Sequence, residues 1–263
     1  MDGENDRMEI KLPNTKEPAS RVNPKTVIVF SQPKMGKTTI VAGLDNCLII
    51  DLEKGTDFVN ALKYDVIRTA ESENKLPIVI LKQLIETIKT ANADKKGYVY
   101  NFIAIDTVTA LEDIVLPLAN KMYRDTSIGR NWVGEDVTSL PNGAGYRYTR
   151  EALKMVLNEL ESICDTLIIL GHTKDKLVEK EGKEMNERGL DLTGKMAGIL
   201  CSKVDAIGYL YRHENETIIN FQSSESLLCG ARSEHLKGKE IVVAKSDGTG
   251  NIAIDWSQIF INK

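Results

Sequence analysis

Residues 27–39, VIVFSQPKMGKTT, join an apolar run to a polar turn that ends in Gly-Lys-Thr-Thr. A β-branched run, a turn and a helix start are typical of a phosphate-binding loop, in which backbone N–H groups at a helix N-terminus face phosphate oxygens. Lys37 is expected to reach the β- and γ-phosphates of ATP, and Thr38 to offer its hydroxyl to Mg²⁺. The predicted nucleotide-binding residues are Ser31, Gln32, Pro33, Lys34, Met35, Gly36, Lys37, Thr38 and Thr39.

Ser31 departs from the usual pattern G-x-x-x-x-G-K-[ST], because it stands where the first glycine is expected. Gly36, where the backbone must approach phosphate most closely, is retained. A small serine can still adopt a turn conformation without a large side chain in the way. The alternative is a chance strand, turn and helix, since motif matches carry a real false-positive risk.

Two further apolar runs end in acids. Residues 47–51, CLIID, read as a buried parallel strand and are followed by Glu53, while residues 102–106, FIAID, end at Asp106 in a Walker B pattern. Ligands of open α/β sheets bind at the carboxyl ends of the strands, so both acids are expected near the nucleotide. Asp106 is predicted to act beside Mg²⁺ with Thr38, and Glu53 to orient or deprotonate a water. A solvated loop acid is the alternative for Glu53.

His172 ends a third apolar run, residues 166–172 with the sequence TLIILGH. The run predicts a strand that places this histidine at the same sheet edge as Lys37, Glu53 and Asp106. We therefore predict that His172 senses the γ-phosphate. A purely structural histidine is the alternative.

Cations and aromatic residues alternate between residues 121 and 150, and residues 124–145 form a long connection that contains four glycines. Long connections of this kind are usually functional or disordered. Aromatic faces and cations together suit single-stranded DNA, because bases stack and phosphates pair. The alternative is that the aromatic side chains anchor the segment to the core. The candidate DNA-binding residues are Arg124, Arg130, Trp132, Arg147 and Tyr148.

The predicted fold class is α/β, with a central, mostly parallel sheet flanked by helices and extended by antiparallel strands at the C-terminal end. Residues 1–24 are expected to be a flexible tail, and residues 25–263 a single domain. Residues 173–195 are expected to form a mobile loop of uncertain role. Helices are expected at 56–62, 77–91, 109–123 and 146–163, a strand at 64–67, and the late strands at 204–211, 217–221, 240–244 and 251–256.

The composition of the 263 residues, 42% hydrophobic and 27% charged, is that of a globular protein with a sizeable core. No apolar run is long enough to span a membrane, and the acidic N-terminus lacks the order of a signal peptide, so we expect a cytoplasmic protein without membrane partners. A net charge of −4 gives no global attraction to nucleic acid, so DNA binding would need a local patch. The cysteines form no C-x-x-C pair and are predicted to be small core residues: Cys47, Cys164, Cys201 and Cys229.

The order of these elements resembles the RecA-type P-loop ATPase core, and within it the phage-encoded RecA-like ATP-binding proteins associated with single-strand annealing. CLIIDLEKGTD looks like the strand that carries the family's catalytic glutamate, FIAIDTVTALED like its Walker B strand, and LIILGHTKDK like the strand before its second DNA-binding loop. The resemblance covers about residues 25–255. It implies that Glu53 is the base, that His172 takes a sensor position often held by Gln, and that residues 124–145 and 173–197 are the two DNA-binding loops.

The function implied by this resemblance is a DNA-stimulated ATPase of phage-type recombination or single-strand annealing, found in the host cytoplasm if phage-encoded. Single-stranded DNA and further copies of the chain are the expected partners, with single-strand-binding or replication proteins as further candidates. Charge on the γ-phosphate is commonly met by a cation from a neighbouring subunit, for which Arg232 is favoured over Lys237 and Lys239 because its guanidinium is planar.

Three alternatives to this function remain open at the level of sequence. The first is a replicative helicase-type motor or a helicase loader, because the ATPase core alone does not say which work ATP does. The second is a nucleotide-dependent switch that acts on proteins without DNA. A small-molecule kinase fits least, because Glu53 and the two long segments would then lack a role.

Overall fold

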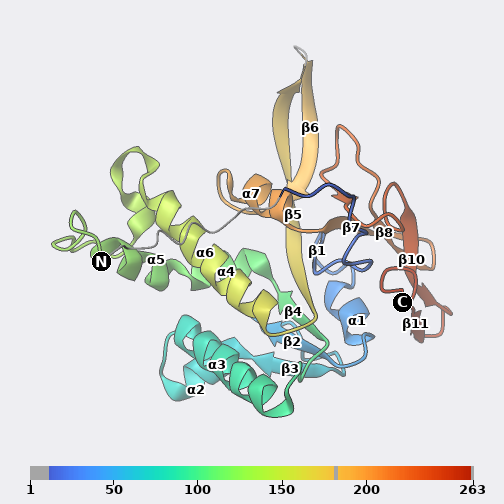
Figure 1. Cartoon of the computed structure of the whole chain (residues 1–263), viewed down its shortest axis with the longest axis horizontal. Coiled ribbons are helices and arrows are strands. Elements are labelled where there is room, and N and C mark those ends of the chain that lie inside the picture. Colours follow the sequence, from blue (N-terminus) through green and yellow to red (C-terminus); the bar gives the residue numbers. More distant parts are fainter. Residues whose placement is uncertain (1–11, 181–182, 262–263) are drawn as a thin grey trace, which may run out of the picture.

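The computed structural model describes residues 12–180 and 183–261. Its centre is an 11-stranded sheet with the order β11-β10-β8-β7-β1-β5-β4-β2-β3, with β6 and β9 off this path (Figure 1). Neighbouring strands from β3 to β7 in this order run parallel, whereas the pairs beyond β7 are antiparallel. The parallel strands are β1 (Thr26–Ser31), β2 (Cys47–Asp51), β3 (Leu62–Asp65), β4 (Phe102–Asp106), β5 (Thr166–Lys180) and β7 (Ala206–His213). The predicted α/β class is confirmed.

The antiparallel extension consists of short strands that follow β7. They are β8 (Glu216–Asn220), β9 (Gly230–Ala231), β10 (Glu240–Ser246) and β11 (Ile252–Ile254). The prediction that late strands extend the sheet is therefore confirmed, except that the first of them, expected at 204–211, is β7, which lies parallel to β1. Within the described residues, no helix combines the length and the apolar character needed to cross a membrane.

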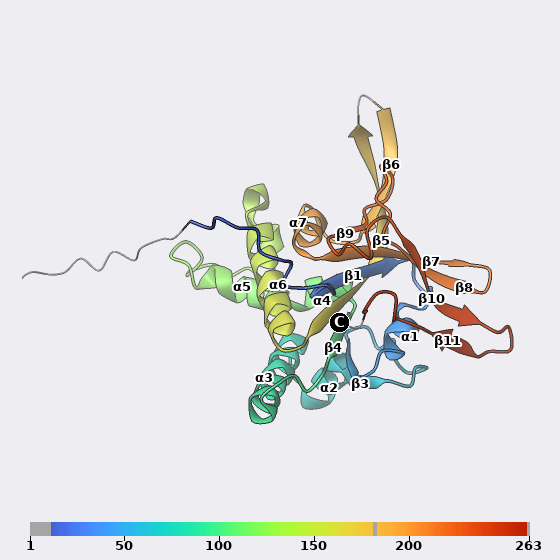
Figure 2. The ribbon, with the colours of Figure 1, turned by 45° about the vertical axis from the view of Figure 1, so that its right-hand side comes forward.

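Alternate residues of the parallel strands face opposite sides of the sheet, and each side has its own core. Ile28 and Phe30 of β1 lie in the larger core, and Val27 and Val29 in the smaller one. The smaller core is covered by α1 (Lys37–Ala42) and the C-terminal segment (Figure 2). The larger is covered by α2 (Val66–Glu73), α3 (Pro77–Lys95), α4 (Val108–Ile114), α5 (Leu116–Arg124), α6 (Gly145–Ser162) and α7 (Met196–Lys203). Burial on both faces explains the nearly continuous apolar runs of the parallel strands.

The prediction of a helix at residues 56–62 is wrong. These residues form turns that lead into β3, because the buried Asp51 carboxylate holds the chain there by accepting hydrogen bonds from Gly55 N and Thr56 N. The strand expected at 64–67 is also displaced. Asp65 caps the N-terminus of α2 by accepting a hydrogen bond from Arg68 N at 2.8 Å, so the helix begins at Val66.

The helices expected at 77–91 and 146–163 are confirmed as α3 and α6, although α3 continues to Lys95. The helix expected at 109–123 is instead two helices, α4 and α5, which meet at Val115. Pro117 lies in the first turn of α5, where its missing N–H costs nothing, but it could not lie within one continuous helix.

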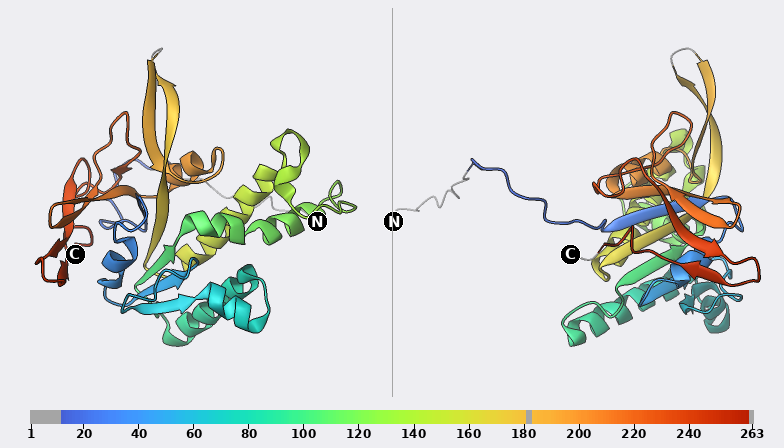
Figure 3. Two further views of the ribbon diagram at one scale, coloured as in Figure 1. Left: turned by 180° about the vertical axis from the view of Figure 1, so that it is seen from behind. Right: turned by 90° about the vertical axis from the view of Figure 1, so that its right-hand side faces the viewer.

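The mobile loop expected at 173–195 is also wrong for most of its length. Strand β5 continues beyond the sheet to Lys180, and β6 (Lys183–Leu190) returns beside it, so the two strands form a hairpin that projects from the body of the molecule (Figure 3). The guanidinium of Arg188 bonds to the Asp175 carboxylate across the hairpin at 2.8 Å. Cross-strand ion pairs of this kind stabilise an antiparallel pair.

All four cysteines are buried and free, as predicted. Burial raises the pKa of the Cys47 and Cys164 thiols to about 12, and that of Cys201 and Cys229 to about 11. Of the tail expected at 1–24, residues 1–11 lie outside the described residues, and residues 12–22 have no helix or strand and are exposed.

Candidate active site

The turn between β1 and α1 has the backbone of a phosphate-binding loop. Gly36 caps α1 with φ 95°, and Lys34 has φ 65°, so the left-handed conformation falls on these two residues. Ser31 is instead the last residue of β1, in extended conformation and buried. The backbone conformation at Ser31, where the motif usually has its first glycine, can therefore be adopted by any residue.

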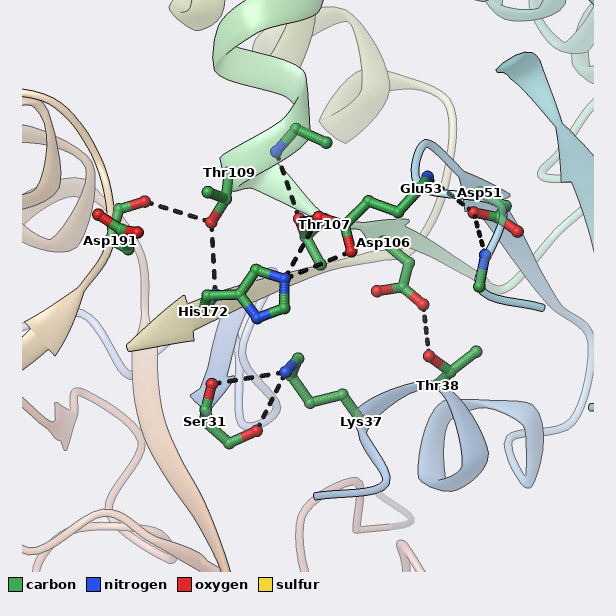
Figure 4. A network of polar contacts seen from close by, with 12 residues as sticks. Ser31, Lys37, Thr38, Asp51, Glu53, Asp106, Thr107, Thr109, His172 and Asp191 are labelled. Atoms are coloured by element: carbon green, nitrogen blue, oxygen red, sulfur yellow. Dashed lines mark hydrogen bonds and ion pairs between the residues drawn. The ribbon is translucent and has the colours of Figure 1, made fainter. Parts of the chain in front are cut away.

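Lys37 is a buried cation, with 6% of its surface exposed. Its amino group donates to Ser31 Oγ at 3.2 Å and to Gln32 O at 3.3 Å, and lies 3.5 Å from Ser31 O (Figure 4). Burial lowers the pKa of Lys37, and the nearby charges of Asp106 and Glu53 oppose this effect. The partners of the amino group are neutral oxygens, so its charge can be met by an anion such as phosphate.

Thr38 and Asp106 meet across the site, at the start of α1 and the end of β4. The Thr38 hydroxyl donates to Asp106 Oδ2 at 2.5 Å, and the carboxylate is buried with 5% of the residue exposed. Burial raises the pKa of Asp106, and the bond from Thr38 works in the other direction. These are hard oxygen ligands, as Mg²⁺ requires.

The donor set fits Mg²⁺ because this ion takes one or two protein ligands and completes its shell with phosphate and water. Among the described residues, no group of three or more His, Cys, Asp or Glu side chains could hold a metal by itself. An ion at Thr38 and Asp106 would therefore need the nucleotide as a further ligand.

Glu53 is presented by a turn that Asp51 organises. The Asp51 carboxylate is 1% exposed and accepts hydrogen bonds from Glu53 N at 2.9 Å and from the Thr56 hydroxyl at 2.7 Å. Glu53 Oε1 in turn accepts from the Thr107 hydroxyl at 2.6 Å. The hydrogen bond with His172 lowers the pKa of Glu53 most, with a smaller effect of the same sign from Thr107. The carboxylate is thus kept ionised and able to accept a proton.

His172 lies next to Ser31 in the register of β5 and β1. Its Nε2 is 3.3 Å from both Glu53 oxygens, whereas its Nδ1 is buried and has no hydrogen-bond partner in the described part of the chain. Figure 4 shows the ring between Glu53 and Lys37, with the second nitrogen on the side of Lys37. A ring nitrogen in this place could bond to an oxygen of a ligand held by Lys37.

Three side chains of this network are not predicted from the sequence, namely Asp51 as the organiser of the turn, Thr107 and Thr109. The Thr109 hydroxyl accepts from His172 N at 3.4 Å and donates to Asp191 O at 3.2 Å. The signal available in the sequence was Thr107, which directly follows Asp106 at a position where hydroxyls cap helices, with Thr109 two residues further on.

Arg232 does not lie at this site in its own chain. It follows β9, which pairs with the first residues of β7, and thus lies at the opposite, amino end of the parallel strands. Its guanidinium donates to Ser202 O at 2.8 Å and to Lys203 O at 3.1 Å, and bonds to the Asp205 carboxylate at 3.3 Å. Lys237, one of its two alternatives, pairs with Glu234.

The aromatic candidates for DNA binding pack against one another. The Trp132 ring lies 5.3 Å from that of Tyr123, and the Tyr148 ring lies 5.2 Å from that of Tyr123. The Arg124 guanidinium lies over Trp132 at 5.2 Å and donates to Gly134 O at 2.8 Å. The positions of Arg124, Trp132 and Tyr148 are thus explained by the alternative, in which these side chains anchor the segment to the core.

Arg130 and Arg147 are different, because both side chains are exposed. Within residues 12–180 and 183–261, neither guanidinium has a hydrogen bond or an ion pair. Asn120 ties the segment to α5 by bonding to Glu135 O at 2.5 Å and to Val137 N at 2.8 Å. Arg130 therefore stands on an anchored segment, and Arg147 lies in the first turn of α6.

Comparison with known proteins shows which family the chain matches. A family model described as an AAA domain matches residues 23–245. A search of curated proteins gave no match. A crystal structure of the RadB recombinase has 11% sequence identity and a TM-score of 0.42, with 88% of this chain and 91% of that chain covered.

A second solved structure, an ATPase from the type III secretion system of pathogenic bacteria, has 12% identity and a TM-score of 0.37, with 81% of this chain and 59% of that one covered. At this level of similarity, neither structure bears on what the chain does. The match to the family model covers both the site described above and most of the sheet that carries it.

Proposed function

The chain belongs to this AAA domain family, and from that premise we propose that it is a Mg²⁺-dependent ATPase that binds single-stranded DNA in phage-type recombination or annealing. The observation that carries the ATPase part is the convergence of three pairs of groups at the carboxyl edge of the sheet. These are Lys37 with its loop oxygens, Thr38 with Asp106, and Glu53 with His172.

Each group has a distinct role in hydrolysis. Lys37 offsets the negative charge of the phosphates, and Thr38 and Asp106 hold Mg²⁺. When bound, the ion supplies Lewis-acid stabilisation of phosphate oxygens. Glu53 is ionised and open to solvent, so it can orient the attacking water and accept its proton. His172 fixes Glu53 through Nε2 and leaves Nδ1 for the γ-phosphate side of the site.

The DNA part of the proposal is supported by Arg130 and Arg147, which are exposed cations without partners among the described residues. Such cations bind phosphate without reading sequence. The packing of Trp132 and Tyr148 favours a second candidate function instead, a nucleotide-dependent switch that acts on a protein. Aromatic faces committed to the core offer less stacking surface to bases.

One experiment separates these functions. ATP hydrolysis would be measured with and without a single-stranded oligonucleotide, for the wild type and for Glu53→Gln. We expect hydrolysis that DNA stimulates in the wild type, and a loss of roughly 10²-fold with retained ATP binding in Glu53→Gln. A wild-type rate that DNA does not change, with no DNA binding at low salt, would favour the protein switch. Normal turnover in Glu53→Gln would refute the role of Glu53.

A homo-oligomer with a shared site is a further part of the proposal. Because Arg232 lies at the amino end of the strands, any contact with a nucleotide would have to be with that of a neighbouring subunit. Mixing Arg232→Ala with Lys37→Ala subunits tests this, since a mixed interface would contain one intact site. Partial recovery of activity would support sharing, and no recovery at any ratio would show that subunits are self-contained.

A further inference from the structure

Strand β7 brings an arginine to the phosphate-binding loop from the side that the groups described above leave free. β1 pairs with β5 on one side and with β7 on the other, and Phe30 lies next to Tyr209 in the second pair. Arg212 follows Tyr209 near the carboxyl end of β7. A terminal nitrogen of its guanidinium lies 3.1 Å from the position that a Cβ atom would take at Gly36. The side chain therefore reaches over the loop.

The charge of Arg212 is not neutralised by the protein. The residue is exposed, and its guanidinium has no hydrogen bond or ion pair within the described ranges. Other arginines of the chain are paired, such as Arg68 with Asp57 and Arg188 with Asp175. A free guanidinium held beside the one glycine that shapes the loop is placed for an anion that the loop binds.

We infer that Arg212 is a phosphate-binding residue of the nucleotide site of its own chain, and that it contacts the diphosphate part that ATP and ADP share. This inference rests on the proposed ATPase function. The assignment to the shared diphosphate is based on the fact that Arg212 and the hydrolytic residues lie on opposite sides of β1. Glu53, Asp106 and His172 come from β2, β4 and β5, all on one side of β1, and they mark the γ-phosphate. Arg212 comes from β7 on the other side.

Two cations of different kinds then hold the nucleotide. Lys37 is buried and lies among the hydrolytic groups, whereas Arg212 is exposed and presents a planar fork that can bond to two phosphate oxygens. A contact to the shared diphosphate stabilises substrate and product complexes equally. It affects affinity and the release of ADP, and leaves the hydrolytic step unchanged.

The test is equilibrium binding, measured by fluorescence anisotropy with labelled ADP and with a labelled non-hydrolysable ATP analogue, both with Mg²⁺. Arg212→Ala and Arg212→Gln are expected to weaken both nucleotides about tenfold, the usual scale for one charge-assisted hydrogen bond. The KM for ATP is expected to rise in parallel with this loss of affinity. Lys245→Ala is the matched control, because it removes one positive charge from the neighbouring antiparallel strands, where Lys245 pairs with Glu216.

The outcomes separate this inference from the function on which it rests. Wild-type protein that binds neither nucleotide would refute both. Normal binding by wild type and by both Arg212 variants, with loss in Lys37→Ala, would refute only the role of Arg212. Weakening confined to the ATP analogue, or a fall in the saturated rate alone, would place Arg212 on the γ-phosphate and overturn the assignment. If Lys245→Ala weakened nucleotide binding as much, the effect would come from the loss of any positive charge in this region, and the assignment of Arg212 would also be overturned.

Discussion

The carboxyl edge of the parallel strands and the segment between α5 and α6 both gather polar and charged residues, but they hold them differently. At the strand edge, Lys37 and Asp106 are buried, and short hydrogen bonds link Asp106 to Thr38 and Glu53 to Thr107. In the segment between the helices and the adjoining first turn of α6, the aromatic rings are packed together, and Arg130 and Arg147 are exposed to solvent.

This difference shows where the geometry of each region comes from. Groups at the strand edge are positioned by the fold before any ligand arrives, which is what catalysis requires. Solvent-exposed arginines keep their rotamer freedom and are ordered only when a partner binds, which costs conformational entropy. Mutations should accordingly have large effects on chemistry at the edge and small, salt-dependent effects in the segment.

Lys37→Ala should produce the largest effect. It removes the cation that faces the phosphates and leaves the apolar core intact, so we expect nucleotide turnover to fall by about 10²-fold or more while the protein stays folded. ATP hydrolysis and circular dichroism would be measured together. Lys89→Ala, which alters an exposed lysine paired with Glu86 on α3, is the control. Unchanged hydrolysis in folded Lys37→Ala would exclude the phosphate-binding loop.

Asp106→Asn should separate stability from function. Because burial raises the pKa of Asp106, the folded state binds this proton more tightly than the unfolded state, and stability falls as the pH rises through the raised pKa. Removing the charge should therefore raise the melting temperature at neutral pH by about 2–4 °C, the shift that corresponds to ~1 kcal/mol in a chain of this size. Mg²⁺-dependent nucleotide binding should weaken by about tenfold or more. A lower melting temperature would mean that the Thr38 bond to the carboxylate outweighs the cost of burial.

His172→Ala should have a smaller effect on rate and a diagnostic effect on pH dependence. The bond from His172 holds the pKa of Glu53 below its ordinary value, so its removal raises that pKa. The acid limb of the pH–rate profile for ATP hydrolysis should then move to higher pH, and the rate at neutral pH should fall about tenfold. His172→Gln keeps a hydrogen-bond donor and should leave the limb in place. An unchanged profile in His172→Ala would show that the pair has no part in catalysis.

Trp132→Ala and Arg130→Ala test the other region, with the smallest effects. Trp132 packs on Tyr123 and Arg124, so its removal should lower the free energy of unfolding by about 1–2 kcal/mol. Arg130→Ala should leave stability unchanged and reduce the salt slope of single-stranded DNA binding by about 0.7. Denaturant titration and anisotropy at several salt concentrations give both values. If Trp132→Ala instead weakens DNA binding by about 1–3 kcal/mol without loss of stability, the segment is a stacking platform and the contrast between the regions fails.

Much of the strand edge could be predicted from the sequence alone. A parallel strand buried on both faces has to be apolar along its length, so the polar residue at which each run stops is visible as a break in pattern. This break in pattern identifies Asp106 and His172, the acid-rich turn after residues 47–51 identifies Glu53, and the loop motif identifies Lys37. The whole α/β architecture follows from the same apolar runs and the helices between them.

The local errors have local physical causes. Asp51 and Asp65 are short polar side chains that bond to the backbone ahead of them, and so replace a predicted helix by a turn and shift the start of α2. The sequence after His172 predicts a loop because neither strand of a two-stranded hairpin in solvent has a buried face, so the alternation of apolar and polar residues that marks a strand is missing. Its pairing rests on backbone hydrogen bonds and on the contact of Arg188 with Asp175.

The sequence thus determined which residues end the buried strands and which residues form the loop between β1 and α1, because both are properties of neighbours along the chain. Only the tertiary structure decided what those residues face. The strand order sets β5 on one side of β1 and β7 on the other, and thereby places His172 beside Glu53 and Arg212 beside Gly36. No local pattern encodes these contacts, since each depends on how distant segments pack around the same sheet.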